Sequence, residues 1–289
     1  MKKSIIWSMF LILFAFVFGA SPKLAAADVY VAGMEKEGGI YEYATLWKNG
    51  VAQRLGDRGG ATSVYVSGND VYVAGLKFPG GATLWKNGVA QKLGDGNKYN
   101  TSANSVYVSG SDVYVAGYEQ NAGGVYVATL WKNGVAQALS DGKYKASANS
   151  VYVSGSDVYV AGYEQNAGGV EVATLWKNGI AQRLSDGKYN TSAASVYVSG
   201  SDVYVAGTEQ SAGDVSVAML WKNGVAKDLS DGNRKASATS VYVHGGDVYV
   251  TGDMFNDSIP YTTVATLWKN GVAQKLSAGH GKAMSVFVK

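Results

Sequence analysis

Short runs of valine, tyrosine, threonine and tryptophan alternate along the chain with clusters of glycine, asparagine, aspartate and serine. Runs of roughly four to six such residues, bounded by turn-forming residues, are typical of β-strands. No stretch repeats its apolar residues at the three- and four-residue spacing of an amphipathic helix. The pattern therefore predicts an all-β protein.

The runs recur as a unit. The string Leu-Trp-Lys-Asn-Gly occurs six times, at Trp47, Trp85, Trp131, Trp176, Trp221 and Trp268, with spacings of 38, 46, 45, 45 and 47 residues. Asp-Val-Tyr-Val also occurs six times, and Ser-Val-Tyr-Val five times. A unit of about 45 residues with four short strands is typical of a propeller blade. We therefore expect a six-bladed β-propeller of four-stranded antiparallel blades.

Two tight turns are expected in each unit. In the third unit, Gly110-Ser111 suits a type II′ turn, and Asn133-Gly134 suits a type I′ turn because both residues accept positive φ angles. All six units keep the Asn-Gly pair. The strands predicted for this unit are 105–109, 112–116, 127–132 and 135–139.

The two ends of the repeat region complement each other. It opens on a second strand at residues 28–32 and ends on a first strand, Ser285-Val286-Phe287-Val288. We expect these two segments to pair and to close the ring without a disulfide. The predicted blades are 28–57 with 284–289, 61–95, 103–141, 148–186, 193–231 and 238–277.

The polarity of the strands predicts their radial order. The Ser-Val-Tyr-Val strands carry no charge, whereas the fourth strands hold pairs such as Gln91-Lys92. The first strand of each blade is therefore expected to lie innermost. The repeated tryptophans and tyrosines are expected to pack between blades, because aromatic rings bury a large apolar area.

The N-terminus has the order of a secretory signal peptide: Lys2 and Lys3, an apolar run from Ile5 to Phe18, and small residues ending at Ala27. Residues 1–27 are therefore predicted to be a signal peptide, with an uncleaved membrane anchor as the alternative. The apolar run is short of the roughly 20 residues that span a bilayer. A secreted, periplasmic or cell-surface location follows from this prediction.

Charge and cysteine content exclude several classes. The chain has 25 basic and 22 acidic residues; cleavage after Ala27 removes Lys2, Lys3 and Lys23 and no acid, which leaves 22 of each. No basic cluster of the kind that binds nucleic acid occurs. The chain has no cysteine, so disulfides and cysteine-based zinc sites are impossible. His244 and His280 are expected at opposite ends of their blade, and we predict no metal site and no cofactor.

The segments Ala-Thr-Leu-Trp-Lys-Asn-Gly-Val-Ala-Gln, Leu-Ser-Asp-Gly and Ser-Ala-Asn-Ser-Val-Tyr-Val-Ser-Gly resemble the HAF-type repeats of bacterial extracellular proteins. The likeness covers nearly all of the chain after residue 27, although Thr stands before Leu-Trp where those repeats have Phe. The resemblance implies a secreted bacterial propeller. It implies no reaction and carries over no catalytic residue.

The longer connections hold the candidate site residues. Aromatic rings beside amides and carboxylates can stack on sugars and hydrogen-bond their hydroxyls, so we predict shallow, repeated glycan sites that bind through avidity. The candidate residues are Tyr118, Glu119, Gln120, Asn121, Tyr144, Tyr163, Glu164, Gln165, Asn166 and Tyr189.

Two other functions remain open. A protein-interaction or cell-surface scaffold would use the same loop face for an extracellular protein. A hydrolase would need two carboxylates in different environments, and Glu119 and Glu164 occupy equivalent positions in similar units. The sequence therefore favours a non-catalytic binding protein, and the alternative that recent duplication copied ordinary loops also stands.

Overall fold

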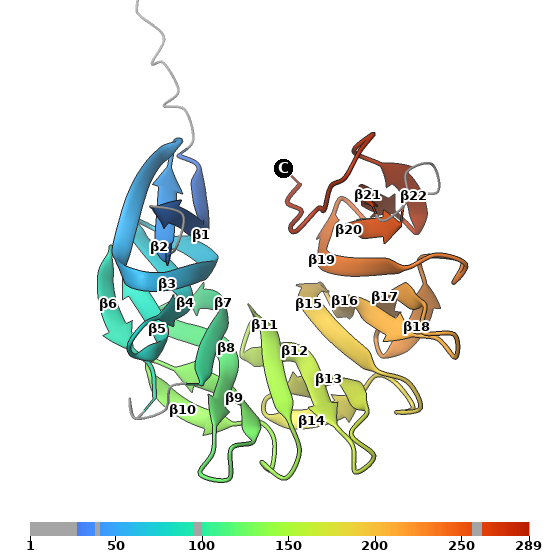
Figure 1. Ribbon diagram of the computed structural model, residues 1–289, viewed down its shortest axis with the longest axis horizontal. Coiled ribbons are helices and arrows are strands. Elements are labelled where there is room, and N and C mark those ends of the chain that lie inside the picture. Colours follow the sequence, from blue (N-terminus) through green and yellow to red (C-terminus); the bar gives the residue numbers. More distant parts are fainter. Residues whose placement is uncertain (1–27, 38–40, 95–99, 256–261, 289) are drawn as a thin grey trace, which may run out of the picture.

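The computed structural model describes residues 28–37, 41–94, 100–255 and 262–288, which form 22 β-strands and no helix. The strands build five antiparallel sheets, one of six strands and four of four strands, set around a common centre in a ring that is open on one side (Figure 1). The prediction of an all-β protein with four-stranded antiparallel sheets is confirmed. The predicted signal peptide, residues 1–27, lies outside the described ranges, within which no helix is long and apolar enough to cross a membrane.

Four sheets are regular and share one order. Their inner strands are β7 (Thr101–Ser109), β11 (Ala146–Ser154), β15 (Thr191–Ser199) and β19 (Ala236–His244). The second strands are β8 (Asp112–Gln120), β12 (Asp157–Gln165), β16 (Asp202–Gln210) and β20 (Asp247–Phe255). The third strands are β9 (Tyr126–Lys132), β13 (Glu171–Lys177), β17 (Ser216–Lys222) and β21 (Thr263–Lys269). The outer strands are β10 (Val135–Ala138), β14 (Ile180–Arg183), β18 (Val225–Asp228) and β22 (Val272–Lys275). The uncharged strands lie nearest the centre, as predicted (Figure 1).

The first sheet has six strands because one long strand is shared. It consists of β1 (Tyr30–Glu37), β2 (Tyr41–Lys48), β3 (Val51–Ser67), β4 (Asp70–Lys77), β5 (Gly81–Lys86) and β6 (Val89–Lys92). β3 pairs with β2 through its first part and with β4 through its last part. The sequence predicted two separate blades here. The connection after Leu55 is too short for a loop, so the backbone stays extended and joins them.

Gly110 has the positive φ angle, 60°, expected of its turn, and the Asn-Gly turn of each unit is held by a side-chain clamp. Asn133 and Gly134 have φ angles of 52° and 82°. The Asn133 side chain accepts a hydrogen bond from the Val113 amide at 2.9 Å and donates one to Asp112 at 2.8 Å. Lys132 Nζ lies 2.7 Å from the same carboxylate. The clamp recurs at Asp28, Asp70, Asp157, Asp202 and Asp247.

The core lies between neighbouring sheets. Trp85, Trp131, Trp176, Trp221 and Trp268 are at most 1% exposed, which confirms that the tryptophans pack between sheets. One cluster joins Ala161 and Leu175 of one sheet to Val196, Val205 and Trp221 of the next. The sheets β7–β10, β11–β14 and β15–β18 therefore bury both of their faces, whereas β19–β22 buries the face that packs on β15–β18.

A ladder of aromatic rings connects the inner strands. Successive ring centroids of Tyr65, Tyr107, Tyr152, Tyr197 and Tyr242 lie 4.7–5.0 Å apart, a spacing at which tilted rings attract each other. Burial raises the pKa of Tyr65 to about 12, with a smaller contribution from Tyr107. The inner wall of the ring is therefore a neutral aromatic surface at physiological pH.

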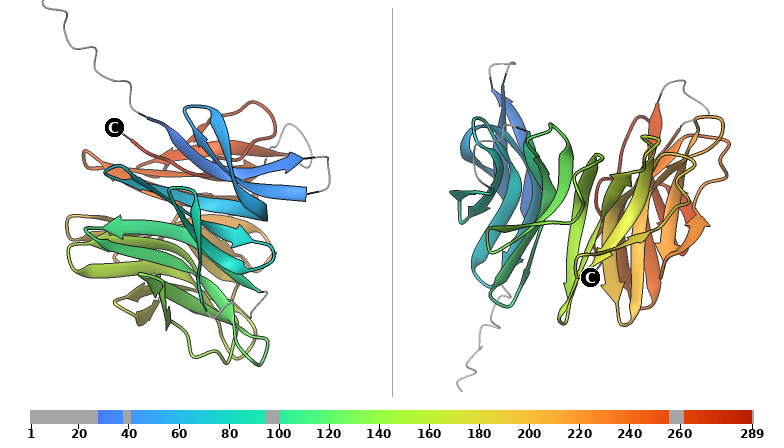
Figure 2. Two further views of the ribbon diagram at one scale, coloured as in Figure 1. Left: turned by 90° about the vertical axis from the view of Figure 1, so that its left-hand side faces the viewer. Right: turned by 90° about the horizontal axis from the view of Figure 1, so that it is seen from below.

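The predicted closure of the ring is wrong for this structure. In the described part of the chain β1 pairs only with β2, and residues 281–288, which we call the tail, form no strand. The tail instead contacts the preceding sheet: the Val286 amide donates to Ser240 Oγ at 3.4 Å, and the Phe287 ring lies 5.1 Å from the Tyr242 ring. Its hydrogen bonds hold it on that sheet, so the ring of sheets stays open beside β1 (Figure 1); Figure 2 gives two further views of the sheets.

The clamp predicts how each turn responds to substitution. Asn133→Ala should lower the free energy of unfolding by about 2 kcal/mol, because alanine resists a positive φ and the side-chain hydrogen bonds are lost. Asn133→Gly, which accepts the backbone angle, should cost about 1 kcal/mol. Urea denaturation of the two variants separates these contributions. Equal losses would show that the backbone angle contributes nothing.

The clamps also predict loss of stability in acid. The hydrogen bond from each lysine, followed by that from asparagine, lowers the pKa of all six clamp aspartates below the ordinary 3.8. The stabilisation is complete above that value and is lost as the pH falls through the lowered folded-state pKa. Burial raises the pKa of Glu164, Glu171 and Glu209, so their protonation favours the folded state and opposes part of this loss. The melting temperature should fall as the pH drops below about 4.

The Asp112→Asn variant provides the control for the acid effect. It removes one of the six titrating carboxylates, so its melting temperature should decline less steeply with falling pH than that of the unchanged protein. An identical slope would show that the clamps do not cause the acid sensitivity.

Candidate functional site

The junction between β3 and β4 departs from the repeat. The connection from β4 to β5 is the short segment 78–80, whereas β8 and β9 are joined by residues 121–125. β3 crosses this region at Gly59 and Gly60. A side chain on Gly60 would approach Met34 Cε to 3.1 Å, so the glycine keeps this space open.

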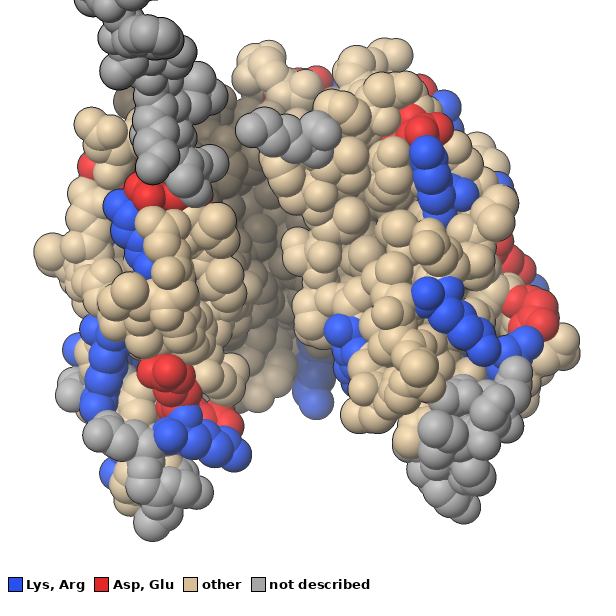
Figure 3. Space-filling view, turned by 90° about the horizontal axis from the view of Figure 1, so that it is seen from above, with Lys and Arg blue, Asp and Glu red and all other residues tan. Residues whose placement is uncertain are grey.

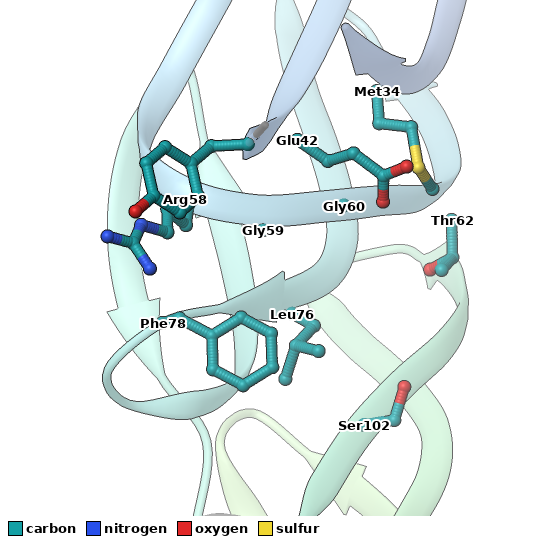
Figure 4. A pocket seen from close by; sticks show the side chains of 10 residues that line it. Met34, Glu42, Arg58, Gly59, Gly60, Thr62, Leu76, Phe78 and Ser102 are labelled. Carbon is teal, nitrogen blue, oxygen red and sulfur yellow. The ribbon is translucent and has the colours of Figure 1, made fainter. Parts of the chain in front are cut away.

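A hollow of about 560 Å³ lies at this junction; we call it the junction hollow. Its apolar lining comes from Met34, Tyr41, Leu76 and Phe78. Figure 4 shows Leu76 and Phe78 on one side of the β3 backbone and Met34 on the other. Met34, Tyr41 and Phe78 are 49%, 39% and 47% exposed, so three large apolar side chains face solvent at one place.

Charged groups lie at the rim of the junction hollow. The Arg58 guanidinium lies 3.4 Å from the centroid of the Tyr41 ring, a cation–π contact. Glu42 forms an exposed ion pair with Lys36 at 3.4 Å, and such a pair contributes little to stability. The hollow therefore combines an apolar lining with one cation and one anion.

The open side of the ring, which we call the seam, exposes residues that are core elsewhere. Val31 is 50% exposed, whereas Val73, Val115, Val160, Val205 and Val250 are each 1% exposed. Trp47 lies opposite Val31 in the β1–β2 pair and is half-buried. On the other side of the seam, Leu276 is 51% exposed, whereas Leu93 is 2% exposed. Figure 3 shows the seam as a deep cleft whose visible walls are largely uncharged.

Most of the predicted loop residues belong to strands. Tyr118, Glu119 and Gln120 end β8, and Tyr163, Glu164 and Gln165 end β12. They were predicted in loops because the second strand was expected to end at residue 116 and its equivalent. The strand continues because its partners on both sides also continue, with Thr101 opposite Glu119 and Tyr126 opposite Gln120.

Asn121 and Asn166 hold the loops together. The Asn121 side chain accepts hydrogen bonds from the amides of Gly123 and Val125 and donates one to the Gly142 carbonyl, at 2.9–3.0 Å. Asn166 makes the equivalent three bonds. Gln120 bonds to Asn100 and to the Gly124 carbonyl. The side-chain amides of these three residues therefore form hydrogen bonds within the fold.

Two of the tyrosines predicted to stack on sugars, Tyr118 and Tyr163, are partly buried within the fold. The Tyr118 ring packs on Tyr126 with centroids 4.8 Å apart. Burial raises the pKa of Tyr118 and of Tyr163. Tyr189 is 40% exposed and lies at the next junction along the ring.

One set of predicted residues does come together. Tyr144, Glu164, Gln165 and Asn166 line a groove of about 340 Å³ between two sheets, and Asp141, Lys143 and Arg183 complete it; we call it the charged groove. Burial raises the pKa of Glu164, and the Arg183 charge opposes that shift. No group of three or more His, Cys, Asp or Glu side chains gathers within the described ranges.

The sequence analysis did not select the residues of the junction hollow. Met34, Arg58 and Phe78 lie where the units depart from one another, and a signal was present: the first spacing between tryptophans is 38 residues instead of 45–47. A shortened unit leaves space that the regular loops fill elsewhere.

No protein-family model and no curated protein sequence matches the chain. Among solved structures, a putative TolB from Agrobacterium tumefaciens matches 81% of this chain and 88% of its own, with a TM-score of 0.50 and 11% identity. The β-propeller domain of the Trilobed protease from Pyrococcus furiosus matches 86% of this chain and 80% of its own, with a TM-score of 0.55 and 11% identity. That domain is described as having an open velcro topology. Pyrococcus horikoshii acylaminoacyl peptidase matches 87% of this chain and 44% of its own, with a TM-score of 0.54 and 14% identity.

The fold is a β-propeller. The structural matches establish this architecture, and at 11–14% sequence identity they establish no activity. The hypothesis of multivalent glycan sites is corrected by these findings: the similar structures are a putative TolB and peptidase propellers. Within the fold, Gln120, Asn121 and Asn166 are hydrogen-bonded and the Tyr118 ring is packed on Tyr126. The resemblance to HAF-type repeats stays a prediction.

The charged groove predicts a measurable coupling. Arg183→Ala should raise the pKa of Glu164 further, because the remaining influence of burial favours the protonated carboxyl. Carboxyl chemical shifts followed by NMR through an acid titration measure this pKa. Lys143→Ala, which removes another cation of the groove, is the control; an equal rise in both variants would contradict a specific influence of Arg183.

Proposed function

We propose that the protein is an exported, non-enzymatic propeller that binds a partner protein, with the junction hollow holding an apolar side chain of that partner. One observation carries the proposal: Met34, Tyr41 and Phe78 are exposed together at the irregular junction. Exposed apolar patches on soluble domains mark interaction sites. A single site at an irregular place differs from the repeated loop sites that the sequence suggested.

The chemistry of the junction hollow favours a polypeptide partner. Its volume of about 560 Å³ is in the range of pockets that enclose ligands. Phe and Met supply an adaptable apolar surface, and Arg58 supplies hydrogen-bond donors for a carbonyl or a carboxylate. Aromatic, methionine and arginine side chains are also those enriched at protein interfaces. The partner we propose presents a large apolar residue beside an acidic one.

Six blades are the finer description that we propose for the fold. β1, β2 and the first part of β3 supply three strands of a first blade, and the last part of β3 with β4, β5 and β6 supplies a complete second one. The repeated clamp supports this division, because it occurs once in each of the six units.

Export and lack of catalysis complete the proposal. The signal-peptide pattern of residues 1–27 supports a secreted or periplasmic location. Burial raises the pKa of both Glu164 and Glu209, which are equivalent residues of neighbouring units. Because burial is the largest influence on both carboxyls and shifts both pKa values in the same direction, the pair does not divide into an acid and a base.

Selection of peptides from a displayed random library against the purified protein tests the proposal. Selected peptides should contain a large apolar residue, and Phe78→Ser should weaken their binding by about tenfold or more, because burying such a side chain contributes roughly 1.5–3 kcal/mol. Val135→Ser, at an outer-strand valine that is 72% exposed, is the matched control. Failure to select peptides, or equal binding by the Phe78→Ser variant, would overturn the proposal.

A further inference from the structure

The tail already makes the hydrogen bonds of an inner strand toward the last sheet, β19–β22. The Val286 amide donates to Ser240 Oγ, a bond that each inner strand from β7 to β19 also makes with the inner strand before it. Thr239 Oγ1 donates to the Ala283 carbonyl at 2.6 Å, which repeats a bond of 2.7 Å between β3 and β7. Tail residues 283–286 therefore correspond to residues 103–106 of β7.

β1 has an open edge on the side where an inner strand would lie. The Val29 carbonyl accepts a hydrogen bond of 2.9 Å from the turn that follows β2. Because backbone groups of successive residues in a strand point to opposite sides, those of Tyr30 and Ala32 point away from β2. Their equivalents in β8, Tyr114 and Ala116, pair with β7. In the described part of the chain β1 pairs with β2 alone, so this edge is available to a further strand.

Gly33 leaves space for the backbone of such a strand. In the later second strands, a Cβ on the equivalent glycine would collide with a carbonyl oxygen of the inner strand; these glycines are Gly75, Gly117, Gly162, Gly207 and Gly252. A Cβ on Gly33 would meet the Trp47 ring at 3.0 Å and, within the described ranges, no backbone atom. In the register set by Ala283, the carbonyl that belongs beside Gly33 is that of Lys282.

The two walls of the seam are the two kinds of face that meet at the other interfaces. There, a face of tyrosine, alanine and leucine packs on a face of valine and tryptophan from the next sheet. At the seam, the first sheet presents Val31 and Trp47, with Val31 50% exposed. The last sheet presents Leu276, which is 51% exposed, whereas its equivalent Leu229 is 7% exposed. Both walls would lose apolar exposure by meeting each other.

We propose that the ring has a second, closed state, in which the tail pairs antiparallel with β1 and latches the last sheet to the first. In the register of β7 on β8, Val286 then lies opposite Val31 and Phe287 opposite Tyr30. Phe287, which is 73% exposed in the open ring, already contacts the Tyr242 ring. The tail keeps its bonds to β19 and adds those to β1, so the latch sets how much of the apolar surface of the seam meets solvent.

The chain has no cysteine, so an engineered disulfide in the full chain tests the closed state. Because the Val286 amide bonds to Ser240, Val31 and Val286 would form a non-hydrogen-bonded pair, whose Cα atoms lie about 4.5 Å apart, within the span of a disulfide. The Val31→Cys/Val286→Cys variant should oxidise to an intramolecular disulfide, with a blue shift of tryptophan emission that Trp47→Phe removes. The matched control, Val51→Cys/Val286→Cys, uses a valine that is 72% exposed at the start of β3 and should form no cross-link.

Hydrogen exchange tests the same state without a cross-link. The Tyr30 and Ala32 amides should exchange about twofold or more slowly in the full chain than in a chain lacking residues 284–289, which corresponds to closure in about half or more of the molecules. The Tyr114 and Ala116 amides, which pair with β7 in both chains, should exchange equally and serve as the control.

The outcomes separate closure by the tail from other arrangements. Absence of an intramolecular disulfide, or equal exchange of the β1 amides with and without residues 284–289, overturns the proposal. A disulfide that joins two chains would show that the tail reaches a second copy, which also overturns it. The Phe78→Ser change should leave the cross-link unaffected, so a failure of partner binding at the junction hollow is distinguishable from a failure of closure.

Discussion

Burial of both faces of each sheet by its neighbours is the constraint on which the structure depends. Two kinds of face meet at these interfaces: tyrosine, alanine and leucine from one sheet pack on valine and tryptophan from the next, with Ala74, Ala116, Ala161 and Ala206 fully buried. Small residues let two sheets approach closely, and the aromatic rings then fill the space that remains. Because each sheet packs on its neighbours through these faces, a sheet on its own would expose the apolar side chains of both faces to water.

The first sheet and the last sheet, β19–β22, flank the seam and meet this constraint on one face only. One side of the first sheet packs on Val73 and Trp85 through Ala44 and Leu46, and the other looks into the seam. The junction hollow and the seam both belong to this sheet, the hollow at its junction with β4 and the seam along β1. The regular sheets, from β7 to β22, carry no comparable irregularity. A fold made of equal units thus concentrates its distinctive surface in the unit that differs.

The architecture was largely readable from the sequence because it depends on local chemistry. Asn133 and Gly134 specify their turn whatever lies around them, and the Val-Tyr-Val runs specify strands that are buried on both faces. The extent of the strands was not readable, since Tyr118 and Glu119 stay extended only because neighbouring strands pair with them. The same holds for β3, whose continuity depends on the short connection between Leu55 and Gly59.

The candidate sites show a similar division. Tyr144 and Glu164 were selected by composition, and the structure does bring them together, whereas Tyr118 and Asn121 turned out to serve internal packing and hydrogen bonding. Met34, Arg58 and Phe78 escaped notice because they are 20 or more residues apart and repeat nowhere. These residues come together where the repeat is irregular, so no motif marks them. Their sign in the sequence is the shortened interval between Trp47 and Trp85.

The unclosed ring has a consequence for how such a protein can change over generations. Residues 111–125 and 156–170 are identical, and stretches this alike invite unequal recombination of the encoding DNA. In a sealed circle, gaining or losing one unit would force every remaining angle to readjust. In an arc, the same event changes only the width of the opening, so the number of units can drift while each surviving contact is inherited intact.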